Sequence, residues 1–326
     1  MTTANRRKVL DMLAEGKISA DEADRLLDTL GRQSTDRKDI GSMVDRGVNM
    51  VTDAVERLSV DIEDTVEGSN AEFDSRKFAV QGEPRIEVNN FNGRVEIEGG
   101  SPEGEVRVDA ELLNPDRVHY SARQDGDTIR VEARPAGRRS IFGWLPFNRG
   151  AHITICLPGR SHLEVNNSNG RVSIRKVEGS GSLRTSNGRI FAEDLSGDFN
   201  LATSNSRIES RHLTGRFEMT TSNGRVTVAG AAGEYRIDTS NGQIRFDGEI
   251  EPGGDNSFTT SNGSITASLG ADPSVRVSAA TSNGSIRCMR PLNAVDTHSK
   301  RRLVGTIGDG QASLKLRTSN GSVTID

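Results

Sequence analysis

The chain has few of the residues on which compact domains are usually built. Hydrophobic residues make up 33% of its 326 residues, and aromatic residues only 4%, with a single tryptophan. These shares are low for a compact globule with a thick apolar core. They suit a repeat protein, in which short structural units are stacked around a thin core.

Cysteine is scarce, and long apolar runs are missing. Cys156 and Cys288 lie far apart in the sequence, so we expect small core side chains rather than a disulfide framework. Residues 1–16 contain no apolar run of signal-peptide length, and no stretch reaches the ~18 apolar residues of a transmembrane helix. We therefore expect a cytoplasmic protein, and as a variant of this a peripheral protein at the inner membrane face.

The sequence also lacks the signatures of several functional classes. Its net charge is −4, without the bulk positive charge of a nucleic-acid-binding protein, so no nucleic-acid partner is expected. The five histidines are scattered without metal-ligand spacing, and no GxSxG, P-loop or dinucleotide motif occurs. We expect no catalytic residues, no metal and no cofactor.

A Ser-Asn-Gly triplet recurs along the second half of the chain. The glycine position returns every 18 residues from 170 to 242 and every 21 residues from there to 284, and Ser204-Asn205-Ser206 replaces one copy. A fixed short period indicates one structural unit stacked on copies of itself. The triplets lie at 168–170, 186–188, 222–224, 240–242, 261–263, 282–284 and 319–321.

The residues around each triplet predict two short strands joined at a sharp corner. A threonine stands three residues before the glycine position in the repeats from Thr185 onward, and a β-branched apolar residue follows two residues after it. A propeller blade needs ~40 residues, so we predict a mainly β protein, a parallel β-solenoid. We favour right-handed winding, because a left-handed hexapeptide helix needs an apolar residue every six positions and this sequence does not have that spacing.

The solenoid is predicted to cover residues 84–326. Residues 86–98 match residues 163–175 nearly position for position, so the first coil precedes an excursion over 99–160. Alternating apolar residues in the excursion predict antiparallel strands that cap the open end of the solenoid. A degenerate coil is expected near residues 303–310, where the spacing of the triplets stretches.

A small α-helical module is expected before the solenoid. Residues 1–31 read as a helical hairpin, and 32–70 as a linker followed by an amphipathic heptad helix. We favour oligomerisation through the apolar seam of that helix, with packing on the solenoid end or membrane contact as alternatives. The seam consists of Val44, Val48, Val51, Val55, Leu58 and Ile62.

Two regions are candidate binding sites. One is a column of arginines that directly follow the corner, which could bind an anionic polymer, a lipid head group or an acidic partner, or could be a solvated edge. The other is the loop over 133–152, where apolar side chains flanked by arginines suit an anionic membrane surface, a protein partner or a plug of the core. The column consists of Arg171, Arg189, Arg207 and Arg225. The candidate residues of the loop are Arg138, Arg139, Phe142, Trp144, Leu145, Phe147 and Arg149.

Two motifs resemble known families. The stretch LAEGKISADEADRLLDTLG resembles the SHOCT-like helical domain of bacterial envelope-stress proteins of the LiaX and YvlB type, and the TSNGxI repeat resembles the "putative adhesin" family DUF4097. The resemblance implies a non-enzymatic β-solenoid tied to cell-envelope stress and, in some relatives, binding of cationic antimicrobial peptides. We expect as partners a second copy, through the helices, and the membrane surface or an envelope-stress membrane protein. The alternatives are a peripheral sensor of anionic lipid and a carbohydrate-active β-helix enzyme.

Overall fold

The computed structural model describes residues 71–102, 104–136 and 149–326. The chain divides into two compact units, residues 1–68 and 69–326, and only the second is described. The predicted helical hairpin and the seam from Val44 to Ile62 therefore lie outside the described residues. Within the described part, the protein is built from 21 strands and one short 3₁₀ turn, η1 (Pro115–Arg117).

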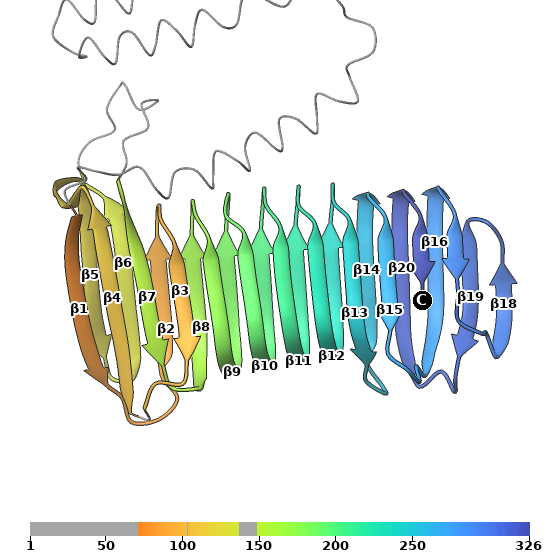
Figure 1. The fold of residues 1–326 in the computed structure, drawn as a ribbon, viewed down its shortest axis with the longest axis horizontal. Coiled ribbons are helices and arrows are strands. Elements are labelled where there is room, and N and C mark those ends of the chain that lie inside the picture. Colours follow the sequence, from red (N-terminus) through yellow and green to blue (C-terminus); the bar gives the residue numbers. More distant parts are fainter. Residues whose placement is uncertain (1–70, 103, 137–148) are drawn as a thin grey trace, which may run out of the picture. The chain divides into compact units, whose positions relative to one another are not determined.

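Four long strands form the regular centre of the solenoid. Their residues pair in parallel at a constant offset of 18, so that Val172, Ile190, Ile208 and Val226 are neighbours. The prediction of a mainly β, parallel solenoid is confirmed, and Figure 1 shows these strands side by side in one row. The four strands are β9 (Val172–Thr185), β10 (Ile190–Thr203), β11 (Ile208–Thr221) and β12 (Val226–Thr239).

Each of these long strands bends twice before it reaches the Ser-Asn-Gly corner. The first bend is a residue in the left-handed region, for example Asp194 with φ 53°. The second is a glycine such as Gly197, with φ 126°. A Cβ atom on Gly197 would lie 1.9 Å from the carbonyl oxygen of Gly179, so glycine is required there. The bends turn each strand around the core, so that one strand contributes to more than one side of the coil.

A column of aromatic rings fills part of the core. Phe199 stacks on Phe217 and Phe217 on Tyr235, with ring centroids 5.8 and 5.6 Å apart. The column starts above Gly181, where a Cβ atom would lie 3.2 Å from the ring of Phe199. Tyr235 is fully buried, and its hydroxyl donates a hydrogen bond to the carbonyl oxygen of Leu213 at 2.7 Å. These aromatic rings thus pack where one coil lies on the next.

The asparagines of the triplets form one continuous ladder along the corner. The side-chain amide of each asparagine donates to the side-chain oxygen of the asparagine in the neighbouring coil, at 2.8–2.9 Å. Beside it, the threonine hydroxyls donate to backbone carbonyls of the neighbouring coil, as Thr260 does to Gly242 at 2.9 Å. In order along the solenoid the ladder comprises Asn169, Asn187, Asn205, Asn223, Asn241, Asn262, Asn320 and Asn283.

At the N-terminal end the coils do not follow the order of the sequence. The coil of β2 (Arg85–Asn90) and β3 (Val95–Gly99) lies between two later ones. On one side it pairs in parallel with β6 (Thr128–Pro135) and β7 (Gly150–Leu157). On the other it pairs with β8 (Arg160–Asn167) and β9. The predicted excursion therefore contains two strands of an outer coil, β6 and β7, as well as antiparallel strands.

The antiparallel strands close this end of the row, as the sequence predicts. β4 (Glu105–Leu113) pairs with β7 and with the edge strand β1 (Ala71–Ala79), and β5 (Val118–Asp125) pairs with β6. Strand β1 carries an ion pair, in which Nε of Arg76 lies 2.8 Å from a carboxylate oxygen of Asp74. Both residues lie opposite buried positions of β4. Charges on an edge strand oppose pairing with another chain. The cap thus ends the sheet at β1 and β5.

The C-terminal end contains a second coil out of order. Along the row of strands, β12 pairs with β13 (Ile244–Ile250) and β14 (Asp255–Asn262), and β13 pairs with β15 (Ile265–Leu269). The coil of β20 (Ala312–Asn320) and β21 (Val323–Ile325) comes next, although the coil of β16 (Val275–Asn283) and β17 (Ile286–Cys288) precedes it in the sequence.

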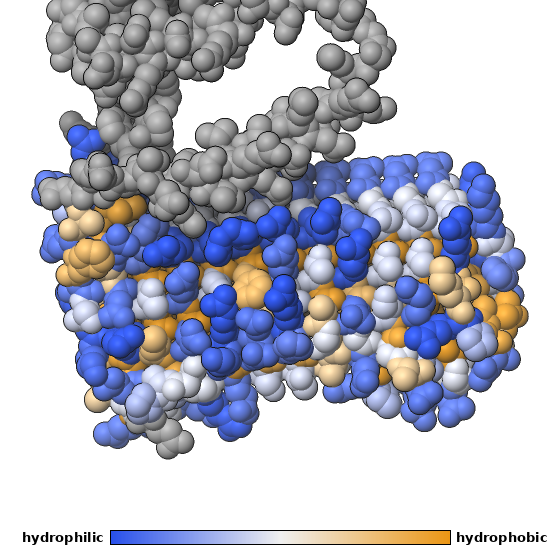
Figure 2. Space-filling model, viewed as in Figure 1, coloured by the Kyte–Doolittle hydropathy of each residue, from blue (hydrophilic) through white to orange (hydrophobic). Residues whose placement is uncertain are grey.

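The expected degenerate coil near residues 303–310 does not exist. Those residues belong to β19 (Arg302–Ile307) and the turn after it, and β19 pairs antiparallel with β16 and with β18 (Ala294–His298). The long spacing between triplets arises because a hairpin covers β16 before the chain returns to the solenoid. Apolar side chains gather at this end of the row, where Met289 and Val295 are exposed (Figure 2).

We predict that Gly242→Ala lowers the free energy of unfolding by about 3 kcal/mol, as overpacking of a rigid site does. A Cβ atom on Gly242 would lie 1.8 Å from the carbonyl oxygen of Gly224 in the preceding coil. Denaturant unfolding measures the change, and Gly159→Ala is the control, because nothing lies within 4 Å of its Cβ position. An unchanged midpoint would show that the corner admits side chains generally, as it admits Ser206.

Candidate functional site

The arginines that follow the corner are brought together on one side of the solenoid. The amide of Val172 donates to the carbonyl of Arg189, that of Ile190 to Arg207, and that of Ile208 to Arg225. These bonds place the four arginines of the predicted ladder, Arg171 included, on successive coils. Neighbouring strands are ~4.8 Å apart, so the guanidinium groups are carried at that spacing.

Further arginines that the sequence analysis did not single out share this side. Arg175 and Arg211 lie four residues after ladder positions and alternate with buried residues, so they point outward from the same strand segments. We call this surface the arginine face. It is formed over four coils by six arginines and two glutamates: Arg171, Arg175, Arg189, Arg207, Arg211, Arg225, Glu193 and Glu209.

An aromatic ring lies at the centre of the arginine face. The guanidinium carbon of Arg175 is 5.2 Å from the ring centroid of Phe191, and that of Arg211 is 5.8 Å from it. Both distances are within the range of a cation–π interaction. The ring thus holds two arginines of different coils in place. The signal in the sequence was the period of 18 between Arg175, Glu193 and Arg211, with Phe191 beside it.

Both glutamates of the arginine face are already paired. A carboxylate oxygen of Glu193 lies 3.3 Å from Nε of Arg175, and one of Glu209 lies 2.9 Å from Nε of Arg207. These side chains are 25–46% exposed, and surface pairs of this kind add little to stability. After pairing, the face keeps an excess of four positive charges.

The opposite side of the same coils has no such excess. There Arg216 lies 3.3 Å from Glu234, and Asn200 donates to Glu218 at 3.0 Å. Burial raises the pKa of Asp238 on this side. Its outward charged residues nearly balance: Arg184, Arg216 and Arg236 against Asp198, Glu218, Glu234 and Asp238. Positive charge is therefore concentrated on one side of a chain that is negative overall.

Arg94 of the adjacent coil continues the row of arginines that follow the corner, and it contacts a histidine. His152 of β7 accepts a hydrogen bond at Nδ1 from the backbone amide of Arg94, at 3.1 Å. Burial lowers the pKa of His152, and the charge of Arg94 lowers it further, while Glu111 and Glu96 act in the opposite direction. His152 is thus a neutral neighbour of the column at neutral pH.

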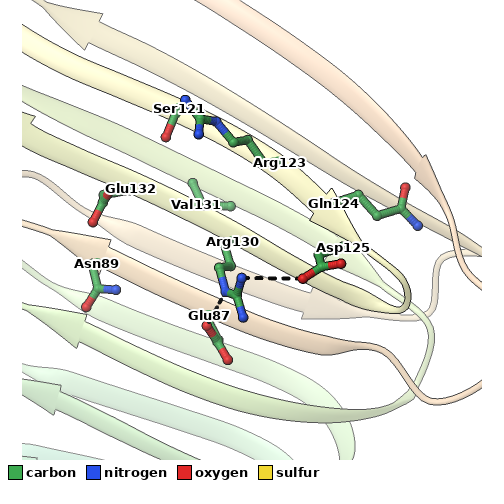
Figure 3. Close-up of a pocket in the computed structure, with 9 residues that line it drawn as sticks. All are labelled: Glu87, Asn89, Ser121, Arg123, Gln124, Asp125, Arg130, Val131 and Glu132. Carbon is green, nitrogen blue, oxygen red and sulfur yellow. Dashed lines mark hydrogen bonds and ion pairs between the residues drawn. The ribbon is translucent and has the colours of Figure 1, made fainter.

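A shallow pocket on β2, β5 and β6 is lined mainly by polar side chains (Figure 3). Glu87 accepts from Arg130 and from Arg85, at 2.8 Å each. These hydrogen bonds, first that of Arg130, lower the pKa of Glu87. Arg130 also reaches Asp125 at 3.7 Å, and Arg85 reaches Glu164 at 3.0 Å. The pocket is a network of paired charges that ties four strands together.

The second candidate region, the 133–152 loop, is described only at its ends. Of the seven residues predicted to bind in this loop, Arg149 is described, and its carbonyl oxygen accepts a hydrogen bond from the side chain of Asn92 at 2.6 Å. The other six positions, from Arg138 to Phe147, lie outside the described residues. Over the described ranges, no group of three potential metal ligands comes together, and no helix has the length and apolar character to span a bilayer.

A stack of in-register parallel coils, closed by antiparallel strands and charged on one side, defines a β-solenoid repeat protein. The chain belongs to the Toastrack DUF4097 family, which matches residues 84–326. A SHOCT-like domain matches residues 5–34. The family to which the TSNGxI repeat was compared is thereby confirmed. No curated protein matches the chain significantly.

Several solved structures are similar to the chain at low identity. One, from Parabacteroides distasonis, is called a putative lipid binding protein; it is 13% identical, with a TM-score of 0.44, over 79% of this chain and 98% of that one. A putative adhesin from Bacteroides fragilis is 14% identical, with a TM-score of 0.35, over 78% and 97%. A putative cell adhesion protein from Clostridium sporogenes is 11% identical, with a TM-score of 0.24, over 78% and 99%.

We predict that acid destabilises the protein in part through His152. Its folded pKa is below the ~6.5 of an unfolded histidine, so the unfolded chain binds more protons below about pH 6.5, and the free energy of unfolding falls as the pH falls. His152→Gln removes this contribution. Denaturant unfolding of both proteins between about pH 8 and pH 5 measures it. Parallel pH profiles of the two proteins would contradict the prediction.

Proposed function

We propose that the protein is a non-catalytic binding scaffold whose arginine face docks an extended anionic ligand. The observation that carries the proposal is the excess of four positive charges on one side of four stacked coils, beside the near balance on the opposite side. Guanidinium groups bind phosphate and carboxylate through two parallel hydrogen bonds. Groups carried at ~4.8 Å intervals suit a ligand with closely repeated charges.

Two features of the repeat favour binding rather than catalysis. The two carboxylates of the arginine face are each within 3.3 Å of an arginine, so they balance charge instead of standing ready to accept a proton. The most regular side chains of the repeat, asparagine and threonine, make the contacts between coils. Their regularity therefore reflects the fold rather than a reaction.

We further propose a role in the bacterial cell-envelope stress response. The support is the pairing of a Toastrack domain at 84–326 with a SHOCT-like domain at 5–34, the combination on which the resemblance rests. In this role the protein acts from the cytoplasm or at the inner membrane face, and the anionic ligand is a polymer, an anionic membrane surface or an acidic envelope-stress membrane protein.

Replacement of two ladder arginines tests the docking proposal. We expect Arg189→Gln with Arg225→Gln to weaken binding of inorganic polyphosphate about 30-fold, at about 1 kcal/mol for each arginine. The matched control is Arg184→Gln with Arg236→Gln, which removes the same charge from the opposite side of the same coils. Titration calorimetry at fixed salt measures both affinities. Equal losses in the two variants would show that net charge, and not the arginine face, governs binding.

A second arm of the experiment addresses the alternative site in the 133–152 loop. Flotation with phosphatidylglycerol vesicles compares the ladder variant with Trp144→Ala and with Arg138→Ala and Arg139→Ala together. Recruitment that is lost only in the loop variants would show that the protein is a peripheral membrane sensor that binds through the 133–152 loop, and not through the arginine face. Recruitment lost only in the ladder variant supports the arginine face as the anionic-surface site.

We also propose that the heptad seam from Val44 to Ile62 joins copies of the chain. Apolar residues spaced alternately by four and three, as in this segment, are the pattern of helices that pair in coiled coils. We expect deletion of residues 40–66 to lower the number of copies per particle, which sedimentation equilibrium gives as the particle mass divided by the mass of one chain. The control replaces Asp45 and Arg46, which flank the seam, by alanine. The same number of copies per particle with and without residues 40–66 would refute the role of the seam.

A further inference from the structure

The coil of β20 and β21, residues 312–325, fills a slot between two other coils. We call it the closing coil. It pairs in parallel with β14 and β15 on one side and with β16 and β17 on the other. The side chains of Leu316, Val323 and Ile325 in it are fully buried. The strands on its two sides are thus joined to each other through a segment that comes later in the sequence than both.

The contacts of the closing coil are those of any interior coil. Thr318 donates to the carbonyl of Gly263, and Thr281 donates to that of Gly321, each at 2.8 Å. Asn320 donates to Asn262, and Asn283 donates to Asn320, at 2.8 and 2.9 Å. The slot therefore recognises the repeat pattern itself, and an identical segment from another copy of the chain makes the same contacts.

The closing coil is attached to the preceding hairpin by a short connection. Residues 308–311 join β19 to β20, and both glycines in them have left-handed φ angles, 59° at Gly308 and 69° at Gly310. A Cβ atom on Gly308 would lie 2.6 Å from the carbonyl oxygen of Pro273. Glycine adopts these angles without strain, so other hinge angles are open to both residues. A short hinge loop favours the exchange of an element between copies.

The outer wall of the slot has an anchor of its own. Arg290, which follows β17, donates to the carbonyl oxygens of Leu269 and Gly270 at 2.5 and 3.0 Å. These carbonyls belong to the end of β15 and the residue after it, on the other side of the closing coil. Withdrawal of the closing coil therefore leaves the outer coil tethered, with two unpaired strand edges facing each other. Such edges favour rapid re-entry of a matching strand.

We propose that the closing coil exchanges between two copies of the chain, so that each copy fills the slot of the other. The dimer is reciprocal and closed, since the same segment and the same slot are used twice. The residues of this exchange are distinct from the arginine face and from the heptad seam. The partner is a second copy because only a segment with threonine, asparagine and glycine in this register completes both ladders.

Single-cysteine variants of the full chain test the exchange. In a background with Cys156→Ala and Cys288→Ala, one chain carries Ser257→Cys and another carries Lys315→Cys; these positions are paired in β14 and β20. Paired strand residues are close enough for a disulfide. We expect a disulfide-linked heterodimer after the two chains are incubated together and oxidised. The matched control mixes Ser257→Cys with Arg236→Cys, which are paired in coils that follow the sequence order, and gives no heterodimer.

Three results would overturn the proposal. The first is the absence of heterodimer in the test mixture while the double variant, Ser257→Cys with Lys315→Cys in one chain, closes internally. The second is equal heterodimer in the test and control mixtures, which would indicate collision instead of exchange. The third is failure of the double variant to close, because the closing coil would then not lie beside β14.

Discussion

The close approach of backbone to backbone at the Ser-Asn-Gly corner is the constraint on which the rest of the solenoid depends. At Gly188, Gly242 and Gly263 a Cβ atom would lie within 2 Å of a carbonyl oxygen in the neighbouring coil. Only coils that approach so closely bring their asparagine amides within 2.8–2.9 Å and their threonine hydroxyls onto the next carbonyl. The same approach stacks the aromatic rings of the core and sets the arginines at strand spacing. Period, core and charged face thus have one origin.

The sequence predicts the unit of this fold well and its order poorly. The 18-residue period, the threonine before each corner and the β-branched residue after it are enough to infer parallel stacked coils. They cannot tell which coils are neighbours, because the pattern of one coil fits any other. Asn320 bonds to Asn262 and Asn283 with the same geometry that joins consecutive coils elsewhere. Only the structure reveals that residues 85–99 and 312–325 are inserted, and that residues 303–307 form an antiparallel strand.

A similar limit applies to the candidate site. The arginines after the corner repeat at the period of the fold, so their alignment can be predicted from Arg171, Arg189, Arg207 and Arg225 alone. The contribution of Phe191 depends on its neighbours in two other coils, Arg175 and Arg211, which lie 16 residues before it and 20 after it in the sequence. Charge balance on the opposite side likewise emerges only when strands are placed next to each other. Periodicity reports what recurs, whereas a binding surface is made by what differs between repeats.

The asparagine ladder gives the solenoid a direction. Each amide in it donates toward the N-terminal end of the row and accepts from the C-terminal side, without a reversal from Asn169 to Asn283. Aligned amides polarise one another, so each bond strengthens its neighbours. Their dipoles add along the axis as peptide dipoles do in a helix. The ladder therefore makes the row electrically polar, with a partial negative charge at Asn283, where side-chain oxygen is the terminal group of the chain of bonds.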